Sequence, residues 1–233
     1  MAPKQPGVYP VVCTYPGHWM RMYAALYVVE DVDEYQADPE GYVAKHALPI
    51  KDELLKFSRP RKEWKFEDLA AEVEKLGPGR SFSNGKQMFQ VGTCVACHKL
   101  NGVGNEFGPD LTKLDPKQQK PAEILRDILE PSHRINEKFQ TVVIETEAGK
   151  VITGLVIEET PDQVKVIENP LAKAEPVVIK KKDIADRKPS KTSIMPKGLL
   201  DKLTREEILD LVAYVLAKGD AKHALYSGGH HHH

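Results

Sequence analysis

Three stretches of the chain place their hydrophobic side chains at the spacing of a helix. The first, over 82–91, leads into a cysteine pair. The second, over 121–131, begins at Pro121, which suits a first helical turn, and ends at Pro131. The third follows a Thr204-x-x-Glu207 capping box and ends near Gly219. Its apolar stripe predicts a buried helix through Ile208, Leu211, Val212, Val215 and Leu216.

Between the second and third helices the pattern changes to alternation with a period of two residues. Short alternating runs occupy 139–146, 151–158, 164–168 and 176–180, with turn residues between them. A short helix or a fifth strand is expected at 184–187. Short strands at this spacing predict a small antiparallel sheet or barrel. Its candidate core positions are Val142, Ile144, Ile152, Val166 and Val178.

The N-terminal part has its own pattern. Residues 7–12 alternate like a strand, and 26–29 read as a second strand after a loop. Short helices are expected over 31–36 and 39–44. Leu69, Val73 and Leu76 then repeat at helical spacing. We therefore interpret 31–79 as a helical connector, with a plausible boundary at the charged, proline-containing segment 58–62.

Composition limits the function classes. The chain has 233 residues, with 41% hydrophobic and 29% charged residues, and a net charge of −1. This balance gives no electrostatic case for binding nucleic acid or an anionic membrane. No apolar run reaches the length of a membrane span. Residues 227–233 read as a linker and an expression tag, and no signal peptide is seen. We interpret the chain as part of a longer exported protein.

The most informative motif is Cys94-Val95-Ala96-Cys97-His98. Two thiols at this spacing can add to the two vinyl groups of a haem, and the adjacent imidazole can take an axial position on the iron. A redox Cys-x-x-Cys pair would instead follow a strand and open a helix. A structural zinc site would need a second ligand pair at short spacing, and none follows. The motif therefore favours one covalent haem c.

Two further segments suit a haem pocket. Residues 102–111 are too rich in glycine for a helix and suit a loop folded against a flat ligand. Met195, in Ser193-Ile194-Met195-Pro196, offers a thioether for the second axial site. The alternatives are a buried core methionine at this position, or His133 as the distal ligand. A surface role suits His133 better.

With these motifs the chain resembles the class I cytochromes c, over about 80–136 and 190–219. The resemblance implies that Cys94 and Cys97 hold the haem and that His98 and Met195 ligate its iron. It also implies that the Pro109 carbonyl orients His98. The remaining family positions are Gly85, Phe89, Leu111 and Tyr214. Tyr214 should meet the first helix near Gly85. The whole unit resembles haem-binding domains of large exported proteins of planctomycete-type bacteria, in which a β segment also interrupts the cytochrome just before the methionine.

A second resemblance concerns the N-terminal hairpin. Cys13, His18 and Met22 follow one another at the spacing of the copper loop of azurin-like cupredoxins. Blue copper needs two histidines, a cysteine and a weak axial methionine. The family's other histidine lies upstream of this loop, and no counterpart precedes Cys13 here. We therefore expect no blue copper site in this chain, with Cys13 free or pairing between two molecules, and a copper site only in the full-length parent.

The sequence thus predicts a mainly α cytochrome c fold with a small antiparallel β-barrel or sheet insert (α+β), preceded by a cupredoxin-like hairpin remnant. The expected parts are the remnant 1–30, the connector 31–79, the cytochrome domain 80–136 with 189–220, and the β insert 137–188. The expected function is electron transfer in the periplasm, with a redox protein or a neighbouring domain as partner and homodimer formation through the remnant. The alternatives are a ligand-binding or catalytic haem, and a docking module that uses the β insert.

Overall fold

The computed structural model describes residues 3–12, 23–51, 55, 62–170 and 175–228. The chain divides into two compact units, Met1–Arg61 and Lys62–His233. This division falls inside the segment 31–79 that the sequence suggested as one connector. Residues 31–51 pack with the N-terminal hairpin, whereas 62–79 belong to the second unit.

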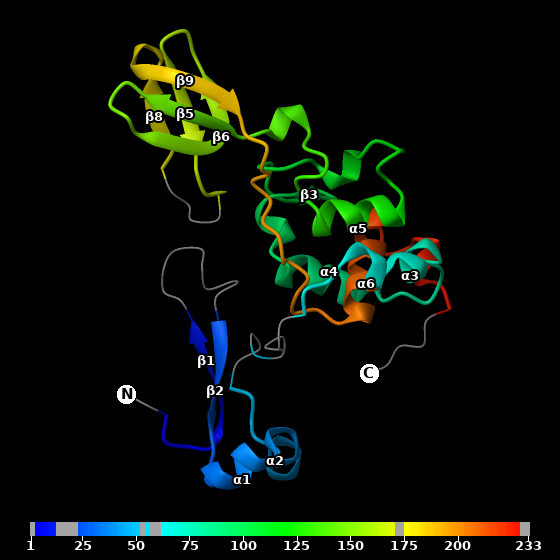
Figure 1. Cartoon of the computed structure of the whole chain (residues 1–233). Helices are drawn as coiled ribbons and strands as arrows, with labels where there is room; N and C mark the ends of the chain where they lie inside the picture. The colour runs from blue at the N-terminus through cyan, green and yellow to red at the C-terminus, as the bar shows by residue number, and fades with distance from the viewer. Residues whose placement is uncertain (1–2, 13–22, 52–54, 56–61, 171–174, 229–233) are drawn as a thin grey trace. The chain divides into compact units, whose positions relative to one another are not determined.

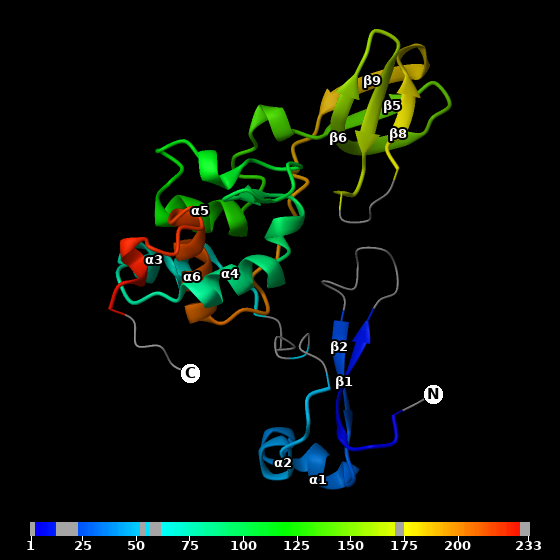
Figure 2. The same cartoon turned by 180° about the vertical axis from the view of Figure 1, so that it is seen from behind.

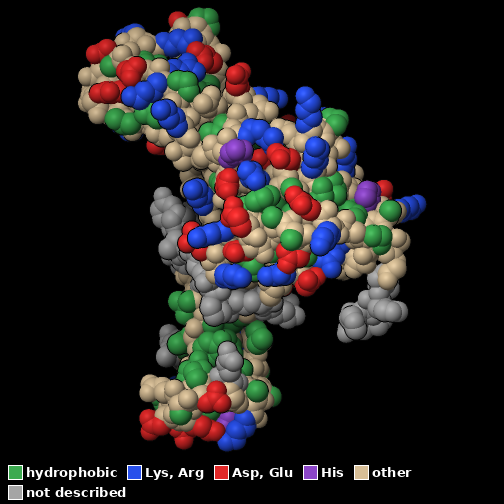
Figure 3. Space-filling view, turned by 45° about the vertical axis from the view of Figure 1, so that its right-hand side comes forward, with side chains coloured by type: hydrophobic (Ala, Val, Ile, Leu, Met, Phe, Trp, Pro, Cys, Tyr) green, Lys and Arg blue, Asp and Glu red, His purple; other side chains and the backbone are tan. Residues whose placement is uncertain are grey.

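The first unit is a hairpin with two short helices. Strands β1 (Gly7–Val12) and β2 (Tyr23–Val28) pair antiparallel, with Val8 opposite Tyr27. The two predicted short helices are present as α1 (Val32–Ala37) and α2 (Pro39–His46). Their N-caps are Asp31 and Asp38. Figure 3 shows hydrophobic side chains gathered on the hairpin, where Val11 and Leu26 are exposed. The small core of this unit consists of Val8, Tyr42, Leu48 and Leu55.

His46, near the end of α2, is an exposed surface residue. Its ring stacks on Tyr42 at 4.1 Å between centroids, and its Nε2 atom lies 3.4 Å from Glu34.

In the second unit, two helices from distant parts of the sequence, α4 (Phe82–Val91) and α6 (Arg205–Leu216), cross in close contact. Helix α4 begins at Ser81, whose side chain accepts from the Asn84 amide. Helix α6 begins with the predicted capping box, and lies beside α4 in both views (Figures 1 and 2). A β-carbon at Gly85 would lie 2.3 Å from the Asp210 carbonyl oxygen and 2.8 Å from Tyr214 Cβ. The absent side chain therefore permits the close crossing, and the predicted approach of Tyr214 is confirmed.

Further short elements complete this helical part. Helix α5 (Pro121–Leu129) carries proline in its first turn and buries Ile124, Leu125 and Ile128. The predicted helix near residue 66 is divided into a 3-10 turn, η2 (Phe66–Asp68), and α3 (Ala70–Glu74). The remaining elements are β3 (Lys99–Leu100), β4 (Val103–Gly104), and the 3-10 turns η3 (Cys94–Ala96), η4 (Leu111–Lys113), η5 (Glu137–Phe139), η7 (Lys181–Asp183) and η8 (Ala224–Tyr226).

The alternating region forms one five-stranded antiparallel sheet in the order β8-β7-β6-β5-β9. Figures 1 and 2 show it as a curved sheet. The alternative of a fifth strand near 184 is the one observed. The strands are β5 (Val142–Thr146), β6 (Val151–Glu159), β7 (Gln163–Ile167), β8 (Val177–Lys180) and β9 (Ile184–Pro189).

The predicted sheet core was partly wrong. Ile144, Ile152 and Val166 are buried, and Val142 packs against them. Val178 is 54% exposed, whereas its neighbour Ile179 is buried. Because successive side chains of a strand point to opposite faces, an error of one position exchanges the inward and outward sets. The mixed helix and sheet content of this unit is compatible with a cytochrome c domain.

Candidate functional site

A cavity in the second unit gathers side chains from distant parts of the chain. It is lined by Phe89 of α4, by Ile124 and Ile128 of α5, and by Leu211 and Val215 of α6. The loops between these helices close it. Their lining residues include the predicted site residues Cys94, Cys97, His98, Pro109, Leu111 and Met195. The structure thus brings together the six residues that the sequence placed around a haem.

The cysteine motif forms a compact turn after α4. Thr93 is buried and has a left-handed backbone (φ 59°), which ends the helical path before the motif. The 3-10 turn Cys94–Ala96 follows, and the His98 amide donates to the Cys94 carbonyl at 2.8 Å. Burial raises the pKa of Cys94 to about 12 and also raises that of Cys97. Both side chains are therefore neutral thiols at the cavity wall.

His98 is held by one directed contact. Its Nδ1 atom lies 2.9 Å from the Pro109 carbonyl oxygen, and because that oxygen can only accept, Nδ1 carries the hydrogen. The Nε2 lone pair is then left for a metal ion. Burial lowers the pKa of His98, and the bond to Pro109 partly opposes this effect. The lowered pKa favours a neutral imidazole, and the bond to Pro109 fixes its tautomer.

Gly108 provides the room for that ring. A β-carbon at Gly108 would lie 2.7 Å from His98 Cε1 and 3.0 Å from its Nδ1 atom. The Gly108 amide also donates to the Cys97 carbonyl at 2.8 Å, which ties the loop to the motif. The glycine-rich composition of this loop was visible in the sequence, but it did not reveal this role of Gly108.

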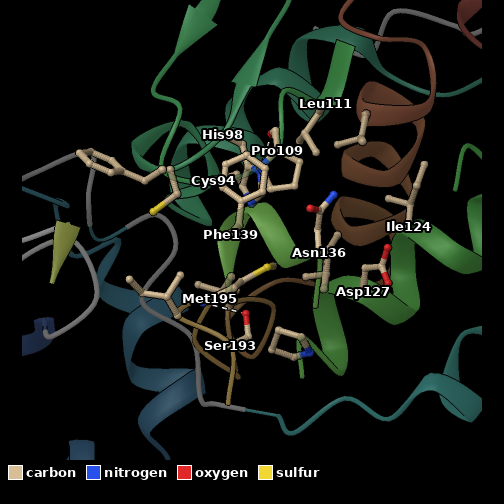
Figure 4. A pocket seen from close by; sticks show the side chains of 18 of the residues that line it. Cys94, His98, Pro109, Leu111, Ile124, Asp127, Asn136, Phe139, Ser193 and Met195 are labelled. Carbon is tan, nitrogen blue, oxygen red and sulfur yellow. Dashed lines mark hydrogen bonds between the residues drawn. The ribbon is translucent and has the colours of Figure 1, made fainter. Parts of the chain in front are cut away.

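Met195 lies on the other side of the cavity from His98 (Figure 4). Its amide donates to Ser193 Oγ at 3.1 Å, and the Ser193 amide donates to Ser132 Oγ at 3.0 Å. Ser132 directly follows Pro131, beyond the end of α5. The methionine segment is therefore fixed by its backbone to a distant part of the chain, a contact that local sequence patterns did not reveal.

Polar residues that the sequence did not single out lie at another part of the cavity wall. Arg134 contacts Asp127 at 2.7 Å and Glu123 at 3.1 Å. Burial raises the pKa of Asp127, although the bond to Arg134 opposes this. Asn136 and Phe139 line the cavity as well, from the segment that leads into the sheet. These residues become neighbours only through the fold.

The donor set fits a c-type haem. Two neutral thiols stand next to a neutral imidazole that presents a free nitrogen, and a thioether lies across an otherwise largely apolar cavity. The space that a β-carbon at Gly108 would take is occupied by the imidazole instead. When bound, such a haem supplies an iron that changes its charge by one electron.

The alternative distal ligand, His133, does not join this site. His133 is exposed and is not among the residues that line the cavity. Cys13, His18 and Met22 lie outside the described residues. Across the described ranges, no cluster of three or more His, Cys, Asp or Glu side chains is arranged to hold a metal ion. In the same part of the chain, no helix combines the length and apolar character required to cross a membrane.

The comparisons with known proteins agree with this geometry. Residues 82–168 match the family model Cytochrome c. The match begins at the first residue of α4, includes the cysteine motif and α5, and ends within the sheet, before Met195 and α6. A search of curated proteins gave no match. The match supports a c-type cytochrome domain in this chain, and that family implies a covalently bound haem c and haem-based electron transfer.

Proposed function

We propose that this chain is an electron carrier that uses one covalent haem c, with His98 and Met195 as the two axial ligands. Cys94 and Cys97 attach the group, and Pro109 fixes the tautomer of His98. The carrier would act as a module and not as an enzyme by itself. One observation carries the proposal: His98 and Met195 line the same cavity although 96 residues separate them in sequence.

The role of each side chain follows from its surroundings. The hydrogen bond from Nδ1 to Pro109 increases the basicity of His98 and prevents rotation of the ring. Met195 gives a neutral sulfur ligand, which favours the reduced iron and raises the reduction potential. With both positions taken by the protein, neither is left open for a substrate, so one-electron transfer is the expected activity.

The covalent attachment has a direct test. Denatured protein should retain its haem, and mass spectrometry should find one haem on the peptide that contains Cys94 and Cys97. Cys94→Ala with Cys97→Ala should release the group on denaturation. Retention of the haem in that double variant would contradict attachment through these thiols.

Electron transfer has its own test. The protein should titrate as a single one-electron couple and should exchange electrons with a small redox dye. The reduced protein should bind carbon monoxide slowly or not at all, because Met195 occupies the distal site. Rapid, stoichiometric carbon monoxide binding would instead favour the ligand-binding or catalytic alternative.

We also propose that the chain comes from a larger exported redox protein, since c-type haem attachment in bacteria takes place outside the cytoplasm. The antiparallel pairing of β1 with β2 supports a cupredoxin-like remnant, because Cys13, His18 and Met22 come between these two strands in the sequence. The partner would be a redox protein or a neighbouring domain. Homodimer formation through the hairpin is a separate proposal, which size measurements on Cys13→Ser and unaltered protein would test.

A further inference from the structure

The chain enters and leaves the β-sheet through two segments that are bonded to each other. We name residues 140–141 and 190–192 the neck. The Ser190 amide donates to the Thr141 carbonyl at 2.8 Å, and Gln140 Nε2 donates to the Ser190 carbonyl at 3.2 Å. Thr141 Oγ1 donates to the Thr192 carbonyl at 3.2 Å. These bonds continue the pairing of β5 with β9 beyond its last residue pair, Val142 and Pro189.

The neck contains two of the few buried polar residues in the part of the chain that the structure describes. Thr141 is 3% exposed and Ser190 is 8% exposed. A buried hydroxyl without a partner is costly, so a neck that merely closed the sheet could use apolar residues there. Both hydroxyls are used here: Thr141 bonds to Thr192, and Ser190 Oγ donates to the same carbonyl at 3.1 Å and accepts from the Thr192 amide at 3.0 Å.

The bonded chain continues from the neck into the haem cavity. Ser193 directly follows the neck and bonds to Ser132, and Met195 bonds to Ser193. On the incoming side, Phe139 directly precedes the neck and lines the cavity. Each of the two connections of the sheet therefore reaches the cavity wall within three residues of the neck.

We propose that the neck and Ser132 are positioning elements for Met195, and that they control how readily this side chain leaves the haem iron. Thr141 and Ser190 fix the segment at one end, and Ser132 fixes it just before the methionine. If a partner bound to the sheet and displaced it, these hydrogen bonds would transmit the displacement to the segment that holds Met195. The inference rests on the proposed His98 and Met195 ligation.

The test measures Met195 lability in the haem-loaded protein. Imidazole displaces a methionine ligand, and the loss of the long-wavelength sulfur-to-iron charge-transfer band reports its rate. Thr141→Val removes the donor to Thr192 while keeping the shape of the side chain, and Ser132→Ala removes the acceptor for Ser193. Since one such hydrogen bond is worth roughly a three- to tenfold change in an equilibrium, each variant should speed displacement by about that factor. Amide hydrogen exchange at 190–195 should rise in parallel.

Two matched variants separate positioning from general stability. Thr146→Val removes a similar hydroxyl bond, to the Lys150 carbonyl at 3.3 Å, at the opposite end of β5. It should weaken the turn and leave the displacement rate unchanged. Thr141→Ser keeps the hydroxyl and should restore most of the wild-type rate. Ser132→Ala keeps the test valid if Thr141→Val fails to fold, because Ser132 lies outside the sheet.

The outcomes are distinct. If the wild-type protein shows the charge-transfer band, but Thr141→Val and Ser132→Ala leave the rate of Met195 displacement unchanged, this inference is overturned while the proposed ligation stands. An equal increase in Thr146→Val would also overturn it, because the effect would then be general loosening of the sheet. A wild-type protein without the band would overturn the proposed ligation and this inference with it.

Discussion

The Nδ1 atom of His98 lies 2.9 Å from the carbonyl oxygen of Pro109. Gly108, which directly precedes Pro109, packs closely against the His98 ring. Position 108 accommodates no side chain beyond hydrogen without a shift of the imidazole or of the loop. Orientation of the His98 ring therefore depends on two adjacent residues, Pro109, which accepts a hydrogen bond, and Gly108, which leaves space.

Gly108→Ala should disturb His98. The added β-carbon would lie 2.7 Å from the ring, so either the ring or the loop must shift. We expect weaker proximal ligation, seen as a lower yield of attached haem and a changed reduction potential. Gly77→Ala is the matched control, because an added β-carbon there would meet only the Lys75 carbonyl oxygen, at an ordinary contact distance of 3.6 Å. A variant at position 108 with wild-type yield and potential would show that the ring has more freedom than the structure indicates.

Gly85→Ala should destabilise the crossing of α4 and α6. The new methyl group would meet the backbone oxygen of Asp210, which cannot rotate away. Overpacking of this kind costs about 1–3 kcal/mol, although alanine gains a little in helix propensity. Denaturant titration of the haem-loaded protein measures the change in the free energy of unfolding. Stability equal to that of wild type would mean that the helices separate without cost.

The two neighbouring residues of β8 should respond differently to truncation. Ile179 is buried in the sheet core, whereas Val178 is largely exposed. Ile179→Ala should lower the stability of the sheet by about 2–4 kcal/mol, and Val178→Ala by less than about 0.5 kcal/mol. Hydrogen exchange of the strand amides measures the stability of the sheet in each variant, and it should be faster in Ile179→Ala than in Val178→Ala. A larger effect at Val178 would show that β8 presents its other face to the core.

The Glu159 ion pairs predict a pH dependence for the sheet. Lys181 and Arg187 lie 2.8 Å and 3.0 Å from this carboxylate and lower its pKa. A lowered folded-state pKa adds stability above the unfolded value, near 4.3, and that stability is lost as the pH falls through the folded value. Glu159→Gln should therefore be less stable than wild type at pH 7 and equally stable in strong acid. Because the group is well exposed, high salt should also remove the difference; a difference that persists in acid would exclude this cause.

Local signals predicted much of the helical part. Helix α4 covers the residues that were expected, and the capping box of α6 is present, because caps and apolar stripes act within one or two turns. The bond from His98 to Pro109 was expected only through the family resemblance, and it is observed. These features depend on residues close together in the chain or on a motif of fixed spacing.

The remaining features could not be predicted from the sequence, because they depend on how distant segments pack together. Alternation located strand β8 but did not say which face of it is buried, so Val178 was placed in the core instead of Ile179. Ser132 and Thr141 carry no motif, and their partners Ser193 and Thr192 are distant in sequence. Hydrogen bonds across such separations follow from tertiary packing and leave no periodic pattern.

The proposed ligation of the haem iron by Met195, opposite His98, has a direct spectroscopic test. The oxidised wild-type protein should show the weak long-wavelength sulfur-to-iron charge-transfer band. Met195→Ala should abolish it, whereas His133→Ala, at the exposed alternative ligand, should retain it. Absence of the band from the wild-type protein, or its survival in Met195→Ala, would contradict the account.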